Sequence, residues 1–241
     1  MYKLSEKGRG VRQMFDDIAG RYDLLNRLLS FGIDRRWRRF AVSQLSIPKN
    51  GRVLDIATGT CDVALEVAEQ TDPSVTIVGE DFTQGMLVQG QKKLASSPLG
   101  ERIMLVNAPC EAIPHPDAIF DGITIAFGIR NVVERQQGLN EMFRVLKPGG
   151  RVVILEFSQP RSELFRRLYY FYFQKMLPAI GGLISRKRSA YQYLPDSVLE
   201  FPAVETFTGM LTQAGFQRLQ ACSLTFGIAT VYVGDKDLEG E

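Results

Sequence analysis

The sequence predicts an α/β fold whose mostly parallel sheet carries helices on both faces. Strand-like apolar runs alternate with segments whose apolar residues recur at helical spacing, and this alternation is typical of such sheets. The expected parallel strands are 52–58, 75–81, 102–107, 120–127 and 150–157. The expected helices between or after them are 62–71, 83–96, 134–147 and 203–215. Residues 217–224 and 226–233 look like two strands joined by a tight turn, so an antiparallel pair is expected to complete the sheet.

The 241-residue chain suits a single domain. Its expected parts are a helical N-terminal cap (1–45), a cofactor-binding core (46–160), an aromatic and basic insertion near the substrate site (161–202), and a C-terminal helix and strand pair (203–241). The cap is dense in arginine, with breaks expected at Gly20 and Gly32. The Lys-Pro-Gly-Gly run at 147–150 predicts the end of a helix and a turn.

Composition excludes several classes of function. Hydrophobic residues (45%) and charged residues (23%) occur at ordinary levels for a globular protein, and the net charge is +2. There is no extended basic face and no Asn-Pro-Pro-Tyr motif, which argues against a nucleic-acid partner. Three cysteines without a Cys-x-x-Cys pair and a single histidine argue against a disulfide framework and a metal site. Because a signal-peptide core and a long apolar run are both lacking, we expect a cytoplasmic protein.

A strand, a turn and a helix in residues 52–71 indicate a nucleoside ligand. The strand runs into the turn at Gly59, and the next strand ends in Glu80 and Asp81. A carboxylate at that place binds ribose hydroxyls in α/β proteins. The G-x-G-x-x-G pattern is lacking, so a single glycine offers no nest for a pyrophosphate. A nucleoside without phosphates is favoured, and S-adenosylmethionine is the obvious candidate.

Several of these residues also have a purely structural interpretation. Asp55 either lies near the sulfonium and amino group of the cofactor or organises the turn at the strand end. Asp81 is the expected ribose ligand, with a helix N-cap as the alternative. Glu80 is expected to be solvated or to support the site from behind. Tyr22 and Asp23 either close over the cofactor as part of an N-terminal lid or pack the cap onto the sheet.

Three blocks of sequence resemble one protein family. The first, at 14–37, contains the pattern YDxxNxxxSxGxxxxW, and the second is Phe-Gly-Ile-Arg-Asn at 127–131. The third is Arg-Val-Leu-Lys-Pro-Gly-Gly at 144–150, continued by Leu-Glu-Phe-Ser at 155–158. Together they closely resemble the ubiquinone/menaquinone-biosynthesis C-methyltransferases, and the likeness extends from about residue 11 to residue 233.

This resemblance implies a class I methyltransferase (Rossmann-like) fold with a seven-stranded sheet. It implies transfer of a methyl group from S-adenosylmethionine to a ring carbon of a polyprenyl quinol, either demethylmenaquinol or a methoxy-polyprenyl-benzoquinol. At matching positions, the Gly59 turn and Thr60 would hold the methionine end, Asp81 the ribose, and the region of Pro109 the adenine. The complete set of expected cofactor contacts is Tyr22, Asp55, Gly59, Thr60, Asp81, Phe82, Pro109, Cys110 and Ala126.

Three positions depart from the usual pattern of the family. Cys61 replaces the final glycine of the turn, and it would be strained if its φ were positive. Pro109 replaces an Asp or Asn that offers a hydrogen bond to the adenine. One lost hydrogen bond costs about 0.5–1.5 kcal/mol, which would weaken cofactor binding without abolishing it. Asp34 stands where many members have histidine.

The expected catalytic residues are Arg130, Asn131 and Asp34. Arg130 and Asn131 follow the fourth strand, at the sheet edge where α/β sites lie, although Arg130 could instead be an ion-pair partner. A quinol ring carbon becomes nucleophilic when the neighbouring hydroxyl loses its proton, so the reduced quinol is the expected substrate. Arg130 could lower the pKa of that hydroxyl but is a poor proton acceptor, which leaves Asp34 as a speculative base.

The aromatic run 168–173, with basic residues on both sides, indicates a lipid-facing surface. One helix buries a stripe and not its whole circumference, so the surplus rings suit an isoprenoid tail. The flanking cations suit anionic lipid head groups, and contact with the inner face of the membrane is expected. The oligomeric state stays open, with a homodimer as one possibility. Two rival functions are methylation of another small molecule and an inactive, cofactor-binding scaffold subunit.

Overall fold

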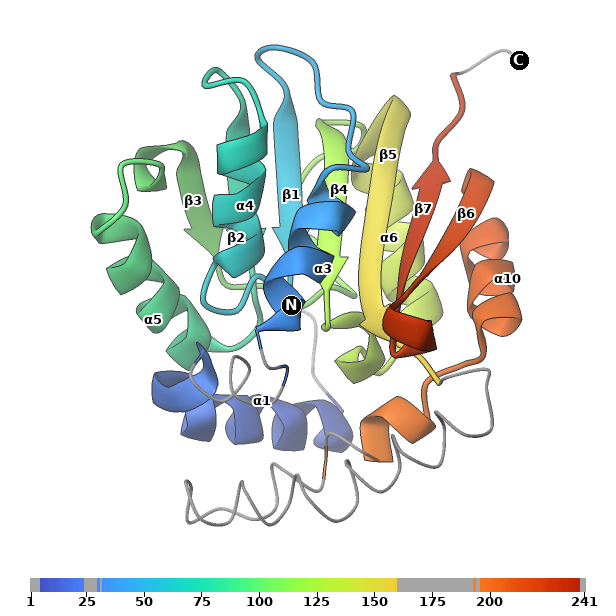
Figure 1. Cartoon of the computed structure of the whole chain (residues 1–241), viewed down its shortest axis with the longest axis horizontal. Coiled ribbons are helices and arrows are strands. Elements are labelled where there is room, and N and C mark those ends of the chain that lie inside the picture. Colours follow the sequence, from blue (N-terminus) through green and yellow to red (C-terminus); the bar gives the residue numbers. More distant parts are fainter. Residues whose placement is uncertain (1–4, 24–29, 31, 160–192, 194–195, 239–241) are drawn as a thin grey trace.

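A computed structural model of the chain describes residues 5–23, 30, 32–159, 193 and 196–238. A seven-stranded sheet forms its centre, with the strand order β3-β2-β1-β4-β5-β7-β6 (Figure 1). The strands are β1 (Arg52–Ile56), β2 (Thr76–Glu80), β3 (Ile103–Val106), β4 (Phe120–Ala126), β5 (Leu146–Phe157), β6 (Gln217–Leu224) and β7 (Ala229–Asp235). β1 to β5 pair in parallel, and β7 pairs antiparallel with β5 and β6, which confirms the predicted sheet. The order reverses where β1 lies beside β4, the place where α/β folds bind ligands.

Helices cover both faces of the sheet. The α-helices are α1 (Glu6–Ile18), α3 (Ile33–Val42), α4 (Asp62–Gln70), α5 (Gln84–Ala95), α6 (Arg135–Val145) and α10 (Val204–Ala214). The 3-10 helices are η1 (Ala19–Arg21), η2 (Gly100–Arg102), η3 (Ile129–Asn131) and η5 (Thr225–Gly227). α3 and α4 lie in front of the sheet and α6 behind it, while α1 lies across the carboxyl ends of the parallel strands (Figure 1). Among the described residues, no helix has the length and hydropathy that a membrane span requires.

Apolar spacing explains which helix faces are buried. Leu139 and Met142 are three residues apart on α6, and both are fully buried against the sheet in a cluster with Leu54 and Ile123. On the opposite face, Val67 of α4 packs in a second buried cluster against β1 and β2. The sheet is therefore apolar on both faces, as a doubly covered parallel sheet requires.

The Lys-Pro-Gly-Gly run differs from its predicted role. α6 ends at Val145 as expected, but β5 begins at once with Leu146, so the run lies within the strand. Leu146 pairs with Phe120 and Arg151 pairs with Gly122, so the residues between them bulge out of the sheet register. A φ of +79° at Gly149 makes this bulge possible, because glycine adopts that conformation without strain.

The described residues of the cap form the helices α1, η1 and α3, as predicted for this part of the chain. α1 begins at Glu6, where the Ser5 hydroxyl accepts a hydrogen bond from the Gly8 N–H at 3.1 Å. Gly32 has a φ of +75° and precedes α3, while Gly20 lies in η1. The aromatic run 168–173 and its flanking cations lie outside the described residues.

Candidate active site

A pocket opens at the carboxyl ends of β1, β2 and β4. The space enclosed measures about 700 Å³ with its open mouth included. Of the expected cofactor contacts, those that line the pocket are Tyr22, Gly59, Asp81, Phe82, Cys110 and Ala126. Asn131 also lines it, whereas Asp34, Asp55, Thr60, Pro109 and Arg130 do not.

Asp81 and the Gly59 turn form the polar end of this pocket. The Asp81 carboxylate accepts hydrogen bonds from the Gly59 N–H at 2.9 Å and the Thr83 N–H at 2.8 Å, one on each oxygen. Each oxygen has a further lone pair, so the carboxylate can also accept hydroxyl groups of a ribose. Burial raises the pKa of Asp81 to about 6, against the effect of these two bonds. An oriented carboxylate at the end of β2 therefore fits a nucleoside.

Cys61 has the strained backbone foreseen for a positive φ. Its φ is +70° and its side chain is fully buried, with the pKa of the thiol raised to about 12 by that burial. The thiol lies over Gly90 of α5, where an added Cβ would be 2.5 Å from Sγ. Cys61 and Gly90 therefore share one space beneath the turn that carries Gly59.

Asp55 lies beneath the turn and is 1% exposed. Its oxygens accept hydrogen bonds from the hydroxyls of Thr58 at 2.6 Å and Thr124 at 2.7 Å. Burial raises the pKa of Asp55 to about 7. These contacts favour the structural interpretation of Asp55, which ties the β1 turn to β4 from below the pocket.

The loop after β3 forms another wall of the pocket. Ala108 and Cys110 line it, while Pro109 between them does not, and the Pro109 carbonyl accepts a hydrogen bond from the Ala112 N–H. Glu111 also lines the pocket, and its carboxylate accepts a hydrogen bond from the Val133 N–H at 3.2 Å. The segment around Glu111 is a turn.

Arg130 is buried behind the pocket wall. Its guanidinium pairs with the Glu156 carboxylate at 2.8 Å, donates to the Phe127 carbonyl, and lies 5.4 Å from the ring centroid of Phe157. The exposed fraction of its side chain is only 6%. These contacts favour the ion-pair interpretation, in which Arg130 holds the 127–131 turn in place.

Asn131 is the expected catalytic residue that reaches the pocket. Its side-chain carbonyl accepts a hydrogen bond from the Tyr193 hydroxyl at 2.9 Å. Burial raises the pKa of Tyr193, so this hydroxyl stays protonated and acts as a donor. The bond orients the Asn131 amide, whose NH₂ group donates to the Phe127 carbonyl at 3.5 Å.

Asp34 lies on α3, outside the pocket lining. One carboxylate oxygen accepts from the Ser30 hydroxyl and the other from Arg38, both at 2.6 Å. An aspartate held by a cation and a hydroxyl in this way is suited to fastening the cap. The contacts therefore favour a structural role for Asp34 over that of a base.

Two further residues shape the pocket and were not among the expected contacts. Phe127 and Gly128 line it, and Phe127 has a φ of +55°. Phe127 packs against the rings of Trp37 and Phe157, at 6.2 and 4.5 Å between centroids. A Cβ on Gly128 would lie 2.5 Å from the Cβ of Ala57, so only glycine lets the two turns approach. Phe127 and Gly128 belong to the Phe-Gly-Ile-Arg-Asn block at 127–131, and this block was the sequence signal that could have identified them.

Comparisons with solved structures show the same fold. The [4+2]-cyclase SpnF superimposes with a TM-score of 0.70 at 16% identity, covering 96% of this chain and 97% of that one. A SAM-dependent methyltransferase from Thermotoga maritima, described as a possible histamine N-methyltransferase, superimposes with a TM-score of 0.65 at 18% identity, covering 94% and 100%. At these identities the likeness establishes the fold alone.

Comparisons with other protein sequences show much higher identities. The chain is 62% identical to the ubiquinone/menaquinone biosynthesis C-methyltransferase UbiE of Geobacter sulfurreducens over 239 residues, covering 99% of this chain and 93% of the relative. It is 49% identical to the demethylmenaquinone methyltransferase of Deinococcus radiodurans over 231 residues, covering 96% and 94%. The profile of the ubiE/COQ5 methyltransferase family matches residues 1–236. The chain therefore belongs to the ubiE/COQ5 methyltransferase family.

Proposed function

We propose that the protein transfers a methyl group from S-adenosylmethionine to a ring carbon of a polyprenyl quinol in ubiquinone or menaquinone biosynthesis. The observation that carries the proposal is the Asp81 carboxylate, which Gly59 and Thr83 hold in the lining of the pocket. The names of the relatives from Geobacter sulfurreducens and Deinococcus radiodurans support the same reaction. Bound S-adenosylmethionine supplies an electrophilic methyl group on a sulfonium ion.

The pocket walls suggest where each part of the cofactor binds. Asp81 would accept the ribose hydroxyls, and Phe82 with Cys110 would flank the adenine. Gly59 and Tyr22 would hold the methionine end, which places the reactive methyl group towards the end of β4. Pro109 would make no side-chain contact with the adenine, because it is not part of the pocket lining.

The quinol would enter beside Asn131. Its ring carbon is a nucleophile only when a neighbouring hydroxyl has lost its proton, so a donor that stabilises the resulting oxyanion accelerates the reaction. The Asn131 amide can be that donor: Tyr193 bonds its carbonyl, and its NH₂ group donates one N–H to the Phe127 carbonyl and has a second N–H for a ligand. The apolar walls, among them Phe15 and Phe127, would exclude water and favour neutralisation of the anionic ring by the cation.

Replacement of Asn131 by alanine tests this role. Removal of one oxyanion donor lowers kcat by about 10²–10³ in other enzymes, so N131A should lower kcat by at least about tenfold. The dissociation constant of S-adenosylmethionine should change little, because Asn131 is not assigned to the cofactor. The control is N140A on the neighbouring helix α6, at an exposed residue outside the pocket. An unchanged kcat for N131A would exclude it from the mechanism.

Turnover with defined substrates tests the function itself. Naphthoquinol and benzoquinol acceptors, each in reduced and oxidised form, distinguish the menaquinone from the ubiquinone pathway. Methylation of another small molecule would favour the first rival function. Cofactor binding without turnover on any quinol would favour the second, an inactive scaffold subunit. The cytoplasmic location, the membrane contact through residues 161–202 and a homodimer stay predictions.

A further inference from the structure

We infer that Lys93 is a positioning residue for the cofactor, because it fastens the N-terminal cap to the turn that lines the pocket. This inference rests on the proposed cofactor site. Lys93 belongs to the last turn of α5, and its side chain is 26% exposed. It lies outside the pocket lining, so its effect on the cofactor must act through other residues.

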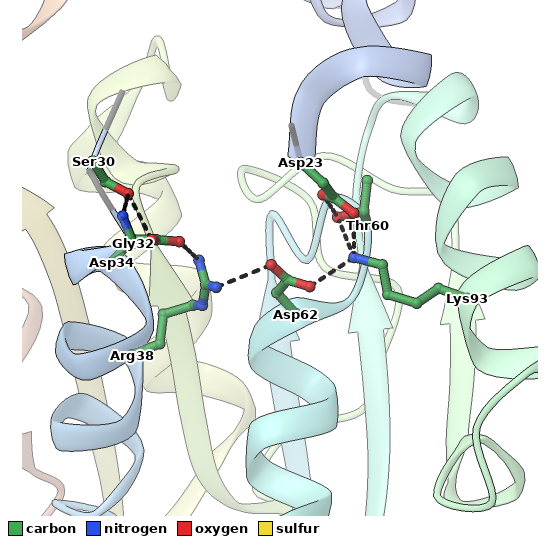
Figure 2. A network of polar contacts seen from close by, with 8 residues as sticks. All are labelled: Asp23, Ser30, Gly32, Asp34, Arg38, Thr60, Asp62 and Lys93. Carbon is green, nitrogen blue, oxygen red and sulfur yellow. Dashed lines mark hydrogen bonds and ion pairs between the residues drawn. The ribbon is translucent and has the colours of Figure 1, made fainter. Parts of the chain in front are cut away.

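The ammonium group of Lys93 contacts three oxygen atoms from three different segments. Its Nζ lies 2.6 Å from the Asp23 carboxylate of the cap, 2.6 Å from the Asp62 carboxylate of α4, and 3.0 Å from the Thr60 hydroxyl (Figure 2). An ammonium group has three N–H donors, so these three acceptors use all of them. The side chain therefore joins the cap, α4 and the β1 turn at one point.

Two of these three contact residues directly follow a residue of the pocket lining. Tyr22 precedes Asp23, and Gly59 precedes Thr60. The Thr60 hydroxyl also donates directly to the Asp23 carboxylate at 2.5 Å, which explains why Thr60 faces the cap and not the pocket. The position of the Tyr22 wall relative to the Gly59 turn is thus set by the contacts of Lys93.

The network of ion pairs extends from Lys93 to α3 and shows why a cation is needed at position 93. Arg38 bridges Asp62 at 3.0 Å and Asp34 at 2.6 Å (Figure 2). Asp23 and Asp62 contact the same nitrogen atom of Lys93, so their carboxylates lie close together. Without the ammonium group, two like charges would face each other across the junction between cap and core, and the cap would be repelled.

A separate contact keeps the cap attached when Lys93 is changed. The Asp16 carboxylate of α1 accepts a hydrogen bond from the Gly85 N–H at 2.7 Å, at the other end of α5. Trp37 of α3 is buried and bonds Thr225 at 2.8 Å. The loss of Lys93 should therefore shift the pocket wall without unfolding the chain.

The variant K93M removes the charge and keeps the length of the side chain. The dissociation constant of S-adenosylmethionine, measured by titration calorimetry, should rise by about fivefold. At saturating cofactor, kcat should stay within about twofold of wild type, because the reacting groups are unchanged. K92M is the matched control: the neighbouring lysine lies in the same helical turn, and its side chain is exposed. K92M should bind the cofactor like wild type.

A second variant tests the contact between Lys93 and the cap by itself. D23N removes the charge of the cap and keeps the pair between Lys93 and Asp62, and it should weaken cofactor binding to a similar extent. Raising KCl from about 0.15 M to about 1 M shortens the Debye length from about 8 Å to about 3 Å. Because the pairs of Lys93 are partly exposed, salt should weaken binding more in wild type than in K93M.

Binding like wild type in K93M or in D23N would overturn the inference, as would an equal loss in K92M. A loss confined to kcat would also contradict it, because a positioning residue for the cofactor acts on affinity. The binding measurements use no quinol. A wild-type protein that binds S-adenosylmethionine but methylates no quinol would contradict the proposed function alone, whereas failure to bind the cofactor would remove both.

Discussion

Replacement of Gly90 by alanine should destabilise the protein in the presence of Cys61 and stabilise it when residue 61 is glycine. The Cβ that G90A introduces would lie 2.5 Å from the buried Sγ of Cys61. Overpacking of this kind costs about 1–3 kcal/mol. Alanine in the middle of a helix gains only about 0.5–1 kcal/mol over glycine, so the single variant G90A should be less stable than wild type by about 1–2 kcal/mol.

The variant C61G has two opposing effects. A non-glycine residue in the left-handed region, such as Cys61 with a φ of +70°, carries a strain of order 1–3 kcal/mol, which glycine relieves. Loss of the buried thiol leaves a space beside Gly90, at a cost of about 1–2 kcal/mol. The single variant should therefore have nearly the stability of wild type.

The double variant should combine the stabilising effects of glycine at position 61 and alanine at position 90. The methyl group that alanine adds at position 90 fills the space left by the thiol, the strain at residue 61 is relieved, and the helix gains stability. We expect C61G/G90A to be more stable than wild type by about 1–2 kcal/mol, with a coupling energy of at least about 2 kcal/mol. The added Cβ would also lie 3.3 Å from the Gly59 carbonyl, so the affinity for S-adenosylmethionine should be measured in the same set.

Urea unfolding of the four proteins, followed by circular dichroism, measures the coupling from the midpoints at a common m-value. The four proteins differ only at these two residues, so each single variant is the control for the double one. Effects that add within about 0.5 kcal/mol would refute the shared space between Cys61 and Gly90. A stabilising effect of G90A alone would refute it as well.

Two further predictions concern buried charges. Burial, together with the charges of Asp81 and Glu141, raises the pKa of Glu80 from 4.5 to about 8, so the folded protein retains a proton that the unfolded chain releases. The free energy of unfolding should therefore fall between about pH 5 and pH 8, and E80Q should remove roughly 4–5 kcal/mol of that loss at about pH 9. The exposed residue Glu101 provides the control variant E101Q, and an equal pH dependence in wild type and E80Q would contradict the assignment. E156A would leave the guanidinium of Arg130 buried without its carboxylate and should lower the free energy of unfolding by about 3–5 kcal/mol, and a loss below about 1 kcal/mol in a urea titration would show that this pair is not required.

Local patterns predicted the parts of the site that are local in the chain. Gly59 and Asp81 directly follow buried strands, and parallel strands bring their carboxyl ends together, so both residues line one pocket. Glu80 illustrates a signal that was present but unused. Successive residues of a strand face opposite sides, so Glu80 faces away from the side of Asp81, and its complete burial excludes the solvated alternative of the prediction.

Contacts between distant segments were beyond local patterns. Arg130 of η3 pairs with Glu156 of β5, and neither a spacing nor a propensity predicts such a pair. Likewise, Asp34 binds Arg38 within one helix, but only the packing of α3 against α4 brings Asp62 to the same cation. For Cys61 the sequence left the sign of φ open, because the backbone of the folded turn decides it.

Transfer of a labelled methyl group from S-adenosylmethionine to a quinol tests the central claim most directly. The purified protein should place the label on a ring carbon of a reduced polyprenyl naphthoquinol or benzoquinol and should leave the oxidised quinone unmodified, as determined by mass spectrometry of the product. Label on an oxygen atom, equal transfer to the quinone, or no transfer to any quinol by a protein that binds the cofactor would contradict the account.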